Sequence, residues 1–559
     1  MSIIFKEDGH TAADAQEPGP SSDGCKSSRS SCELGAEDVD IARSAGVVGF
    51  ATLFSRILGA LRDIFIASFL GAGLVSDAFI AAFRVPDFLR RMFGEGSLSI
   101  AFVPAYTDCL MRHGRPQADQ MANSAIRLLA LVLLLITLAG MAAAPWLVHA
   151  VAPGFAKTAD KFLLTIALTR TMLPYVFFIG LVALSMGILN VLGHFAAPAL
   201  SPVLLNVAMI GALVIGAGFA GSEATLAMWL AVGVVFGGAL QMGLQIPFLV
   251  KKGVYFWQRA RLWHPALHRV LWQMGPVMFG AAVFQINTLA ITFLASFLPQ
   301  GSVSYLYYAD RLIQFPLGIF GIAMATAVLP AFARQSIAGQ QDAMRETFSH
   351  AIKLVLFITL PATAGLIVLR EPIVSLLFQR GAFDQQSMRL TAGALLYYGM
   401  GLWAFSTVRI VLNVFYALAD TRTPVRMAAI SIAVNLLLGA ALMGPMAHQG
   451  LALAVSIASA LNLCLLVVAL RKRLGALGGR DIGLSVSKSA ICAALMGICI
   501  WVAAPWLLPA AAATGSALLP GLAACVGLGI VIYALSARFM DMAELRTVLQ
   551  IARGRIQKQ

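Results

Sequence analysis

Charged residues are scarce in this chain of 559 residues, of which only 12% are Asp, Glu, Lys or Arg. A typical soluble domain carries about 25% charged residues. Apolar residues make up 59% of the chain, and the mean hydropathy is +0.83. Apolar runs of about twenty residues, long enough to cross a bilayer as helices, recur between Gly46 and Ser536. This pattern predicts an all-α polytopic membrane protein and disfavours a very large soluble helical protein.

Several motifs are also missing. The seven cysteines form no CxxC pair and no His/Cys cluster, so neither a metal site nor a disulfide framework is expected. The pattern GxxxxGK(S/T) is absent, which argues against ATP as the direct energy source. No cofactor is expected, and the membrane potential or a gradient of Na⁺ or H⁺ becomes the expected driving force. A coupling-ion site could use Asn413 together with Gln285 and Asn287, although helix packing would explain these residues equally well.

Residues 1–42 lack an apolar run long enough for a signal peptide and are rich in Ser, Gly, Asp and Glu. This composition is typical of a disordered cytosolic tail. The remaining chain predicts fourteen transmembrane helices, at about 43–70, 75–112, 120–152, 159–193, 198–219, 223–250, 265–298, 302–334, 343–369, 386–418, 422–445, 449–471, 484–508 and 516–538.

Basic residues are distributed unevenly over the predicted loops. Twenty lie on one side of the membrane and five, namely Lys157, Lys161, Arg370, Arg380 and Arg389, on the other. Cytoplasmic loops carry the excess of Lys and Arg, so both termini are expected in the cytoplasm. The net charge of +14 is then explained by loops that face anionic lipid, and no nucleic-acid partner is expected.

The sequence repeats internally with an offset of 222 to 228 residues. FLGAGLVS at 69–76 resembles FLPQGSVS at 297–304, and FVPAY at 102–106 resembles VLPAF at 328–332. A repeat of six helices gives two copies with the same orientation, related by an axis along the membrane normal, with a central cavity between them. The predicted parts are an N-lobe at 43–250, a basic linker at 251–264, a C-lobe at 265–471, two extra helices within 472–538 and a basic tail at 539–559.

Charged residues interrupt the second predicted helix, in FRVPDFLRRMFGEGSLS at 83–99. Asp77, Arg84 and Arg91 are seven residues apart, and Asp87 lies three after Arg84. All four therefore share one helical face.

Two other predicted helices also contain polar residues. They are Ser55, Arg56, Arg62 and Asp63 on the first helix, and Asp310 and Arg311 on the eighth. A charge at the centre of a bilayer costs at least about 2.5–3.5 kcal/mol, so such residues usually face protein or water. The set predicts the wall of a hydrated cavity.

Structural ion pairs offer an alternative explanation for individual residues, for example Arg84 with Asp87 or Arg62 with Asp77. Arg90 and Arg91 are adjacent and point about 100° apart on a helix, so one acid is not expected to satisfy both. Arginine binds phosphate with two parallel hydrogen bonds, which lysine cannot do. The preference for arginine therefore indicates an anionic, phosphate-bearing ligand.

Gly94, Glu95 and Gly96 follow this stripe. Glycines let a helix bend or let a neighbouring backbone approach closely. Gly94 and Gly96 are therefore candidates for a gating hinge, with simple packing as the alternative, and Glu95 is a supporting cavity charge.

The segment SRILGALRDIFIASFLGAGLVSDAFIAAFRVPDFLRRMFGEGSLSIAFVPAY at 55–106 resembles the N-terminal signature of the MurJ/MviN family, and YYADRLIQFPLGIFGIAMATAVLP at 307–330 resembles its eighth helix. The family consists of lipid II flippases of the multidrug/oligosaccharidyl-lipid/polysaccharide exporter superfamily, with fourteen helices. The resemblance extends over residues 43–540.

The resemblance implies a transporter, not an enzyme, in the bacterial inner membrane. It would move lipid II, an undecaprenyl pyrophosphate that carries a disaccharide-pentapeptide, to the periplasmic leaflet for peptidoglycan synthesis, and it could contact cell-wall synthesis proteins. Helices 13 and 14 would form a groove for the lipid tail. The family's substrate residues fall on Ser55, Arg56, Arg62, Asp77, Arg90, Arg91 and Arg311, with Asp63, Arg84, Asp87, Glu95 and Asp310 as supporting charges. The alternatives are a flippase for another polyprenyl-pyrophosphate-linked oligosaccharide and a cation-coupled drug antiporter of the same superfamily.

Overall fold

The computed structural model describes residues 24–92, 98–255, 263–508, 515–552 and 554, and every regular element within these ranges is helical. The first half contains α1 (Gly24–Leu70), α2 (Leu74–Met92), α3 (Leu98–His113), α4 (Arg115–Ala142), α5 (Ala144–Val151), η2 (Pro153–Lys157), α6 (Ala159–Met172), α7 (Pro174–Val191), α8 (Ala196–Ala217) and α9 (Glu223–Lys251). The second half contains α10 (Pro265–Ala295), α11 (Ser302–Pro316), the π-helical turn η3 (Leu317–Ile322), α12 (Ala323–Ile337), α13 (Gln341–Val368), α14 (Arg370–Phe378), α15 (Gln385–Gly399), α16 (Leu402–Ala417), α17 (Arg422–Leu474), α18 (Gly479–Leu507), η4 (Gly515–Leu518), α19 (Leu519–Phe539) and α20 (Ala543–Ala552).

By length and composition, nine helical stretches of the described chain can cross a membrane, or ten if α15 and α16, which meet at 44°, form one bent span. The prediction of an all-α membrane protein with many spans is confirmed. The count of fourteen stays a prediction.

Several helix boundaries differ from those predicted. α1 begins at Gly24, inside the segment predicted as a disordered tail, and no proline interrupts the chain from there to Leu70. Three predicted helices are each divided in two, at Ala143, at Leu173 and after Gly399. At the first two breaks a proline is the first or second residue of the next helix, where its missing N–H leaves no hydrogen bond unmade.

α17 is a hairpin of two helices. Ala447 within it has a left-handed φ of 48° and a non-helical ψ of −134°. The hydroxyl of Ser431 donates to the carbonyl of Ala458 at 2.7 Å, which a straight helix would place far apart. A Cβ on Gly450 would lie 2.4 Å from the carbonyl oxygen of Leu442, so glycine is needed where the chain turns back. The hairpin corresponds to the two predicted helices at 422–445 and 449–471.

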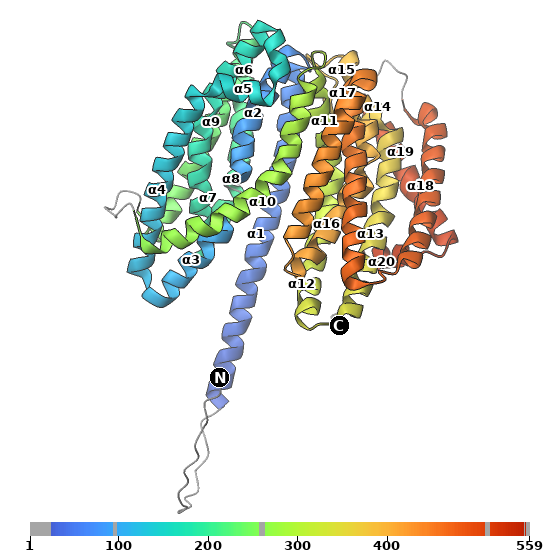
Figure 1. Cartoon of the computed structure of the whole chain (residues 1–559). Coiled ribbons are helices and arrows are strands. Elements are labelled where there is room, and N and C mark those ends of the chain that lie inside the picture. The colour runs from blue at the N-terminus through green and yellow to red at the C-terminus, as the bar shows by residue number, and fades with distance from the viewer. Residues whose placement is uncertain (1–23, 93–97, 256–262, 509–514, 553, 555–559) are drawn as a thin grey trace, which may run out of the picture.

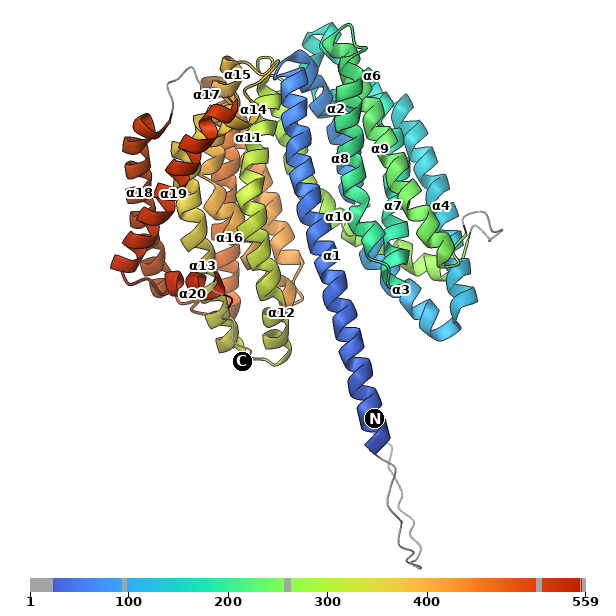
Figure 2. The ribbon, with the colours of Figure 1, turned by 180° about the vertical axis from the view of Figure 1, so that it is seen from behind.

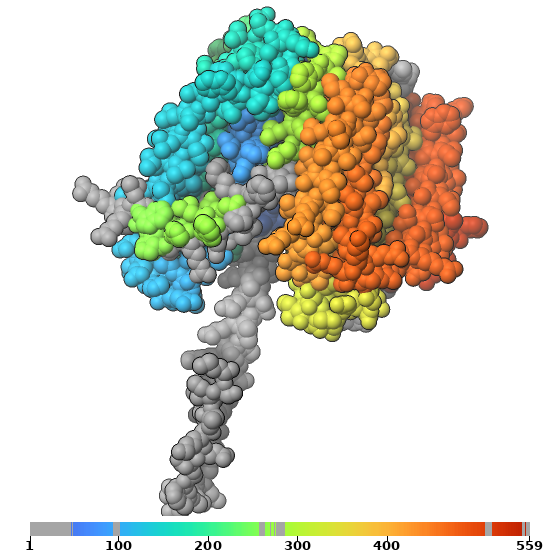
Figure 3. Space-filling view, viewed as in Figure 1, coloured from blue at the N-terminus to red at the C-terminus, as the bar shows by residue number. Residues whose placement is uncertain are grey.

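The helices form two groups, with α1 between them (Figures 1 and 2). We call α2–α9 the N-terminal group and α11–α20 the C-terminal group. α10 packs on α3 of the first group and on α17 of the second, and so bridges them. The surface is recessed between the groups, with N-terminal residues in blue at the back of the recess (Figure 3).

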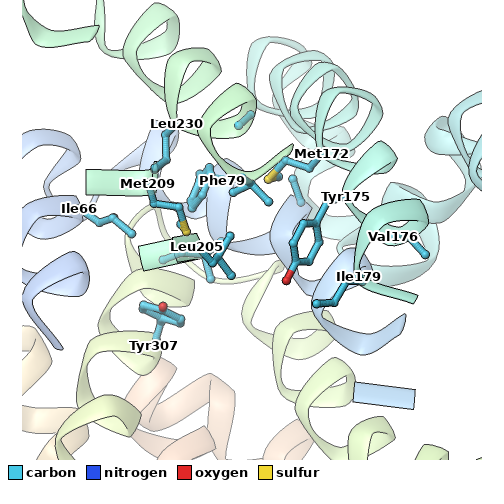
Figure 4. Packing of buried hydrophobic residues seen from close by; sticks show 14 of the residues in the cluster. Ile66, Phe79, Met172, Tyr175, Val176, Ile179, Leu205, Met209, Leu230 and Tyr307 are labelled. Atoms are coloured by element: carbon cyan, nitrogen blue, oxygen red, sulfur yellow. The ribbon is translucent and has the colours of Figure 1, made fainter. Parts of the chain in front are cut away.

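Buried apolar side chains hold each group together. Figure 4 shows Phe79 of α2, Tyr175 of α7 and Met209 of α8 within the largest core cluster, which also reaches α11 and α15. Small residues bring α8 and α9 close, because a Cβ on Gly233 would lie 2.5 Å from the Cβ of Ala212. Such close packing is the main source of helix association in lipid, where apolar surface gains little by leaving the solvent.

Candidate functional site

Asp63, near the end of α1, is the centre of a buried ion cluster. Its Oδ1 accepts hydrogen bonds from Nε and Nη2 of Arg62, at 3.0 and 2.7 Å, and from the hydroxyl of Tyr307 on α11, at 3.0 Å. Its Oδ2 lies 3.4 Å from Nε of Arg311, an ion pair without hydrogen-bond geometry. Asp63 is only 4% exposed, and a buried carboxylate needs such partners. The cluster therefore ties α1 to the C-terminal group.

Arg62 also connects this cluster to α8. Its Nη1 donates to Oδ1 of Asn206 at 3.0 Å, and Nδ2 of Asn206 donates to the carbonyl of Ser55 at 3.2 Å. Asn206 thus fixes both the guanidinium of Arg62 and the backbone of α1 two turns earlier.

The aromatic ring of Tyr307 makes cation–π contacts with two arginines. The Cζ atom of Arg311 lies 4.7 Å from the ring centroid, and that of Arg84 on α2 lies 5.8 Å from it. Both distances are within the range of cation–π attraction. Within the described chain, Nε of Arg84 is buried without a hydrogen-bond partner.

Asp87 binds both Arg90 and Arg91, which the sequence had not predicted. Its Oδ1 accepts from Nε and Nη2 of Arg90, at 3.0 and 2.8 Å, while its Oδ2 accepts from Nε of Arg91 at 3.0 Å. The expectation that one acid cannot satisfy both arginines is therefore wrong. Positions three and four residues later on a helix both reach back to the first residue, and a carboxylate has two oxygens.

Arg56 lies two turns before Asp63 on α1, against the π-helical turn η3 of the C-terminal group. A Cβ on Gly318 would lie 2.4 Å from Nη1 of Arg56, so a larger residue at position 318 would displace this guanidinium. Arg409 on α16 is close enough to Arg56 for their like charges to interact. Asp310 on α11 accepts a long hydrogen bond from Gln314 at 3.4 Å.

Asp77 has a different set of partners, and we call them the Asp77 clasp. Its Oδ2 accepts from Nζ of Lys161 on α6 and from the backbone N–H of Gly301, both at 2.8 Å. Its Oδ1 accepts from the backbone N–H and the hydroxyl of Ser304, at 2.9 and 2.7 Å. The carboxylate therefore caps the N-terminus of α11, where free N–H groups and the helix dipole favour an anion.

Other contacts beside this clasp join the end of α1 to the C-terminal group. The backbone N–H of Ala382 donates to the carbonyl of Ser68 at 2.8 Å, and the hydroxyl of Tyr308 donates to that of Gly71 at 3.2 Å. The residues lie at or just after the end of α1, in α11 and before α15, and their contacts close this end of the bundle.

The structure thus divides the predicted site into parts. Arg62, Asp63, Arg84 and Arg311 meet at Tyr307, Arg90 and Arg91 share Asp87, and Asp77 lies in the clasp. The alternative pairs Arg84 with Asp87 and Arg62 with Asp77 are replaced by these contacts. Gly94, Glu95 and Gly96 lie outside the described residues.

Four residues of this region were not predicted: Asn206, Tyr307, Lys161 and Arg409. Lys161 was expected in a loop, yet it is 4% exposed and paired with Asp77. Arg409 had a usable signal, a lone charge inside an apolar helix. Tyr307 lies one turn before Arg311, but a tyrosine in an apolar helix otherwise resembles a core residue.

Two of the three predicted coupling-ion residues, Asn413 and Asn287, have separate partners. The amide of Asn413 donates to the carbonyl of Ala325 at 2.6 Å, whereas Oδ1 of Asn287 accepts from Asn435 at 2.7 Å. In the part of the chain that the structure describes, no group of three or more His, Cys, Asp and Glu side chains is placed to hold a metal ion.

The charges define what the cluster can bind. Among the residues that the structure describes around Tyr307 and Asp87, five arginines (62, 84, 90, 91 and 311) face three aspartates (63, 87 and 310), an excess of two positive charges in this part of the chain. Guanidinium groups are shaped to hold phosphate oxygens. An anion with two negative charges and phosphate geometry would fit this arrangement.

Comparison with known proteins agrees with this chemistry. The family model "Lipid II flippase MurJ" matches residues 66–519. The chain is 38% identical over 434 residues to the "Probable lipid II flippase MurJ" of Vibrio cholerae, which covers 76% of this chain and 82% of the relative. It is 35% identical over 432 residues to the "Lipid II flippase MurJ" of Burkholderia cenocepacia, with 76% and 83% covered.

Solved structures give the same result. One described as "Lipid II flippase MurJ, inward closed conformation" superposes with a TM-score of 0.74 at 26% identity, covering 88% of this chain and 98% of that chain. An inward-facing multidrug transporter of the MATE family superposes with a TM-score of 0.62 at 17% identity, covering 76% and 95%, which shows a shared fold alone. The chain belongs to the lipid II flippase MurJ family.

Proposed function

We propose that this protein moves lipid II from the cytoplasmic to the periplasmic leaflet of the bacterial inner membrane by alternating access. The observation that carries the proposal is the arginine cluster around Asp63 and Asp87, which lies between the two helix groups and has an excess of positive charge among its described residues. The diphosphate of lipid II would bind there, with Arg56 and Arg409 extending the positive surface.

The proposed membrane orientation follows from the two ends of the bundle. The described starts of α1 and α20 lie at the end opposite to the Asp77 clasp (Figure 1). Basic residues collect in cytoplasmic loops, and the predicted loops at the clasp end hold few of them. The clasp would therefore close the periplasmic end, and both termini would be cytoplasmic, with the recess between the groups open inward.

Matching helix starts support the proposed fourteen spans and two repeats. The pairs α2 and α11, α4 and α13, α5 and α14, α6 and α15, α7 and α16, and α8 and α17 each begin 226 to 228 residues apart. The breaks within the helices therefore recur at equivalent positions, as expected for two copies of one six-helix unit. Counting each broken pair as one span and α17 as two gives fourteen.

The lipid tail would stay in the bilayer beside α18 and α19. These helices lie outside the repeat and pack on each other, while α18 packs on α13 and exposes Ile491, Ile498 and Trp501.

Opening of the Asp77 clasp would let the headgroup leave on the periplasmic side while the recess closes. The membrane potential or an ion gradient would drive the cycle. Contacts with cell-wall synthesis proteins belong to the same proposal.

A drug antiporter of the same fold is the weaker candidate, because a cationic drug would need an excess of carboxylates in the cavity. The deciding experiment is depletion of the protein in cells without another flippase, followed by a leaflet assay for lipid II. Accumulation on the cytoplasmic face is expected. Normal arrival of lipid II at the periplasmic face would refute the proposal.

A further inference from the structure

Arg84 differs from the other arginines of the cluster in its partners. Arg62, Arg90, Arg91 and Arg311 each lie within ion-pair distance of an aspartate oxygen. For Arg84, the structure shows a cation–π contact with the ring of Tyr307, and its buried Nε has no hydrogen-bond partner among the described residues. A buried N–H of a charged group is costly to leave unsatisfied, so it points to a group that binds there.

Arg311 has an open donor of the same kind. Its Nε is also buried and, within the described residues, makes no hydrogen bond, although Oδ2 of Asp63 lies 3.4 Å away. Two guanidinium groups with unfilled donors therefore lie against one aromatic ring. Their like charges repel each other, and the negative face of the ring opposes that repulsion.

Tyr307 is itself firmly held. It is 7% exposed, and its hydroxyl donates to Oδ1 of Asp63, which also accepts hydrogen bonds from the neighbouring Arg62 on α1. Tyr307 and Arg311 are four residues apart on α11 and so share a face, whereas Arg84 approaches from α2. The ring is thus shared between the two groups that must move during transport.

We propose that Tyr307 is a positioning residue whose ring holds Arg84 and Arg311 together as the pair that binds the two phosphates of the substrate. This inference rests on the proposed function and assigns its phosphate subsite. Two adjacent phosphates offer acceptors to both open donors at once, while the oxygens of a single phosphate surround one phosphorus atom and span a shorter distance. The ring therefore confers a preference for diphosphate over monophosphate.

The test measures binding of farnesyl diphosphate and farnesyl monophosphate to the full chain in nanodiscs of neutral lipid. Tyr307→Leu removes the ring and is expected to weaken diphosphate binding about tenfold and monophosphate binding about twofold. Tyr307→Phe keeps the ring and is expected to retain the diphosphate preference within about twofold. Tyr533 provides the matched control, because it is a buried tyrosine whose hydroxyl also makes one hydrogen bond, to the carbonyl of Phe357 at 2.7 Å. Tyr533→Leu is expected to leave the preference unchanged.

An unchanged diphosphate preference in Tyr307→Leu would overturn the inference, and so would an equal loss in Tyr307→Phe. If Tyr307→Leu does not fold, Arg84→Gln decides instead, because it should lower the diphosphate preference by a similar factor, and full retention would refute the assignment. Flipping of lipid II by the wild-type chain in proteoliposomes separates the two levels. Active wild type with an unaffected Tyr307→Leu preference refutes the inference alone, whereas inactive wild type refutes the proposed function.

Discussion

Two buried aspartates, fourteen residues apart, are bound in contrasting ways. Asp77 accepts four hydrogen bonds, two of them from backbone N–H groups at the start of α11 (Gly301 and Ser304), and its charge is paired with one lysine. Asp63 is surrounded by arginines, one of which lies at 3.4 Å without a hydrogen bond. Both sites join α1 or α2 to the C-terminal group.

The two aspartate sites differ in whether hydrogen-bond donors and positive charge remain unsatisfied around the carboxylate. The described donors around Asp77 are matched to its two oxygens, as in a contact that closes the structure and excludes water. Around Asp63 the positive charge exceeds the negative charge and two buried donors remain open, which suits a ligand that enters and leaves. We therefore expect the clasp to determine stability and conformation, and the arginine cluster to determine substrate binding.

The largest effect should come from breaking the clasp. Asp77→Ala leaves Lys161 buried without its counter-charge, and removal of one partner of a buried ion pair costs about 3–5 kcal/mol. The free energy of unfolding, measured by titrating a denaturing detergent and following helix content, should fall by about that amount.

The double variant Asp77→Asn/Lys161→Met is the control. It removes both charges and keeps an oxygen that can accept from the N-terminus of α11, so it should recover part of the stability. If Asp77→Ala unfolds at the wild-type midpoint, the clasp does not stabilise the closed end.

Arg311→Ala is expected to act on transport and not on folding. Asp63 keeps two hydrogen bonds from Arg62, so the cluster stays neutralised, while a donor for the substrate is lost. Flipping of fluorescent lipid II in proteoliposomes should fall about 100-fold, as for loss of a charged hydrogen-bond donor to an anion. Arg473 offers the matched control, since it pairs with Asp420 at 2.7 Å and is half exposed. Arg473→Ala should flip normally, and equal activity of both variants would contradict the site.

Asp87→Asn should strengthen binding. The carboxylate competes with the substrate for Arg90 and Arg91, so its removal frees two guanidinium groups. We expect the affinity for farnesyl diphosphate to rise about tenfold and flipping to slow because release becomes harder. Asp342→Asn removes a comparable pair, with Arg345 three residues later, outside the cluster and should change neither quantity. Weaker diphosphate binding in Asp87→Asn would show that Asp87 positions the arginines instead of competing for them.

This contrast between the two aspartates could not be derived from the sequence. Heptad spacing places Asp77, Arg84 and Arg91 on one side of a helix, but spacing along a helix does not reveal which helix lies opposite. Asp77 caps α11 because Gly301 and Ser304, more than 220 residues away, are brought to it by the fold. Tyr307 carries no sign of its role because its partners come from α1 and α2 as well as from its own helix.

The helical class was more accessible to prediction than the helix breaks. Apolar runs report burial in lipid directly, so the membrane class followed from composition. The interruptions at Ala143 and Leu173 occur inside continuous apolar runs, and prolines there were compatible with either a kink or a new helix. Local sequence does not distinguish these outcomes, because neighbouring helices decide how the freed backbone groups are satisfied.

The smallest effect should come from Asn206, which supports the cluster from α8. Asn206→Ala removes the acceptor of Nη1 of Arg62 and the donor to the carbonyl of Ser55, while both hydrogen bonds from Arg62 to Asp63 remain. A loss of about 1 kcal/mol in positioning would slow flipping of lipid II about fivefold. Gln241→Ala is the control, because its amide also binds α8, at the carbonyl of Ser201, at 2.9 Å. Gln241 has no contact with Arg62 among its described hydrogen bonds, so Gln241→Ala should flip lipid II near the wild-type rate. An equal slowing in both variants would mean that α8 acts through general packing instead of through Arg62.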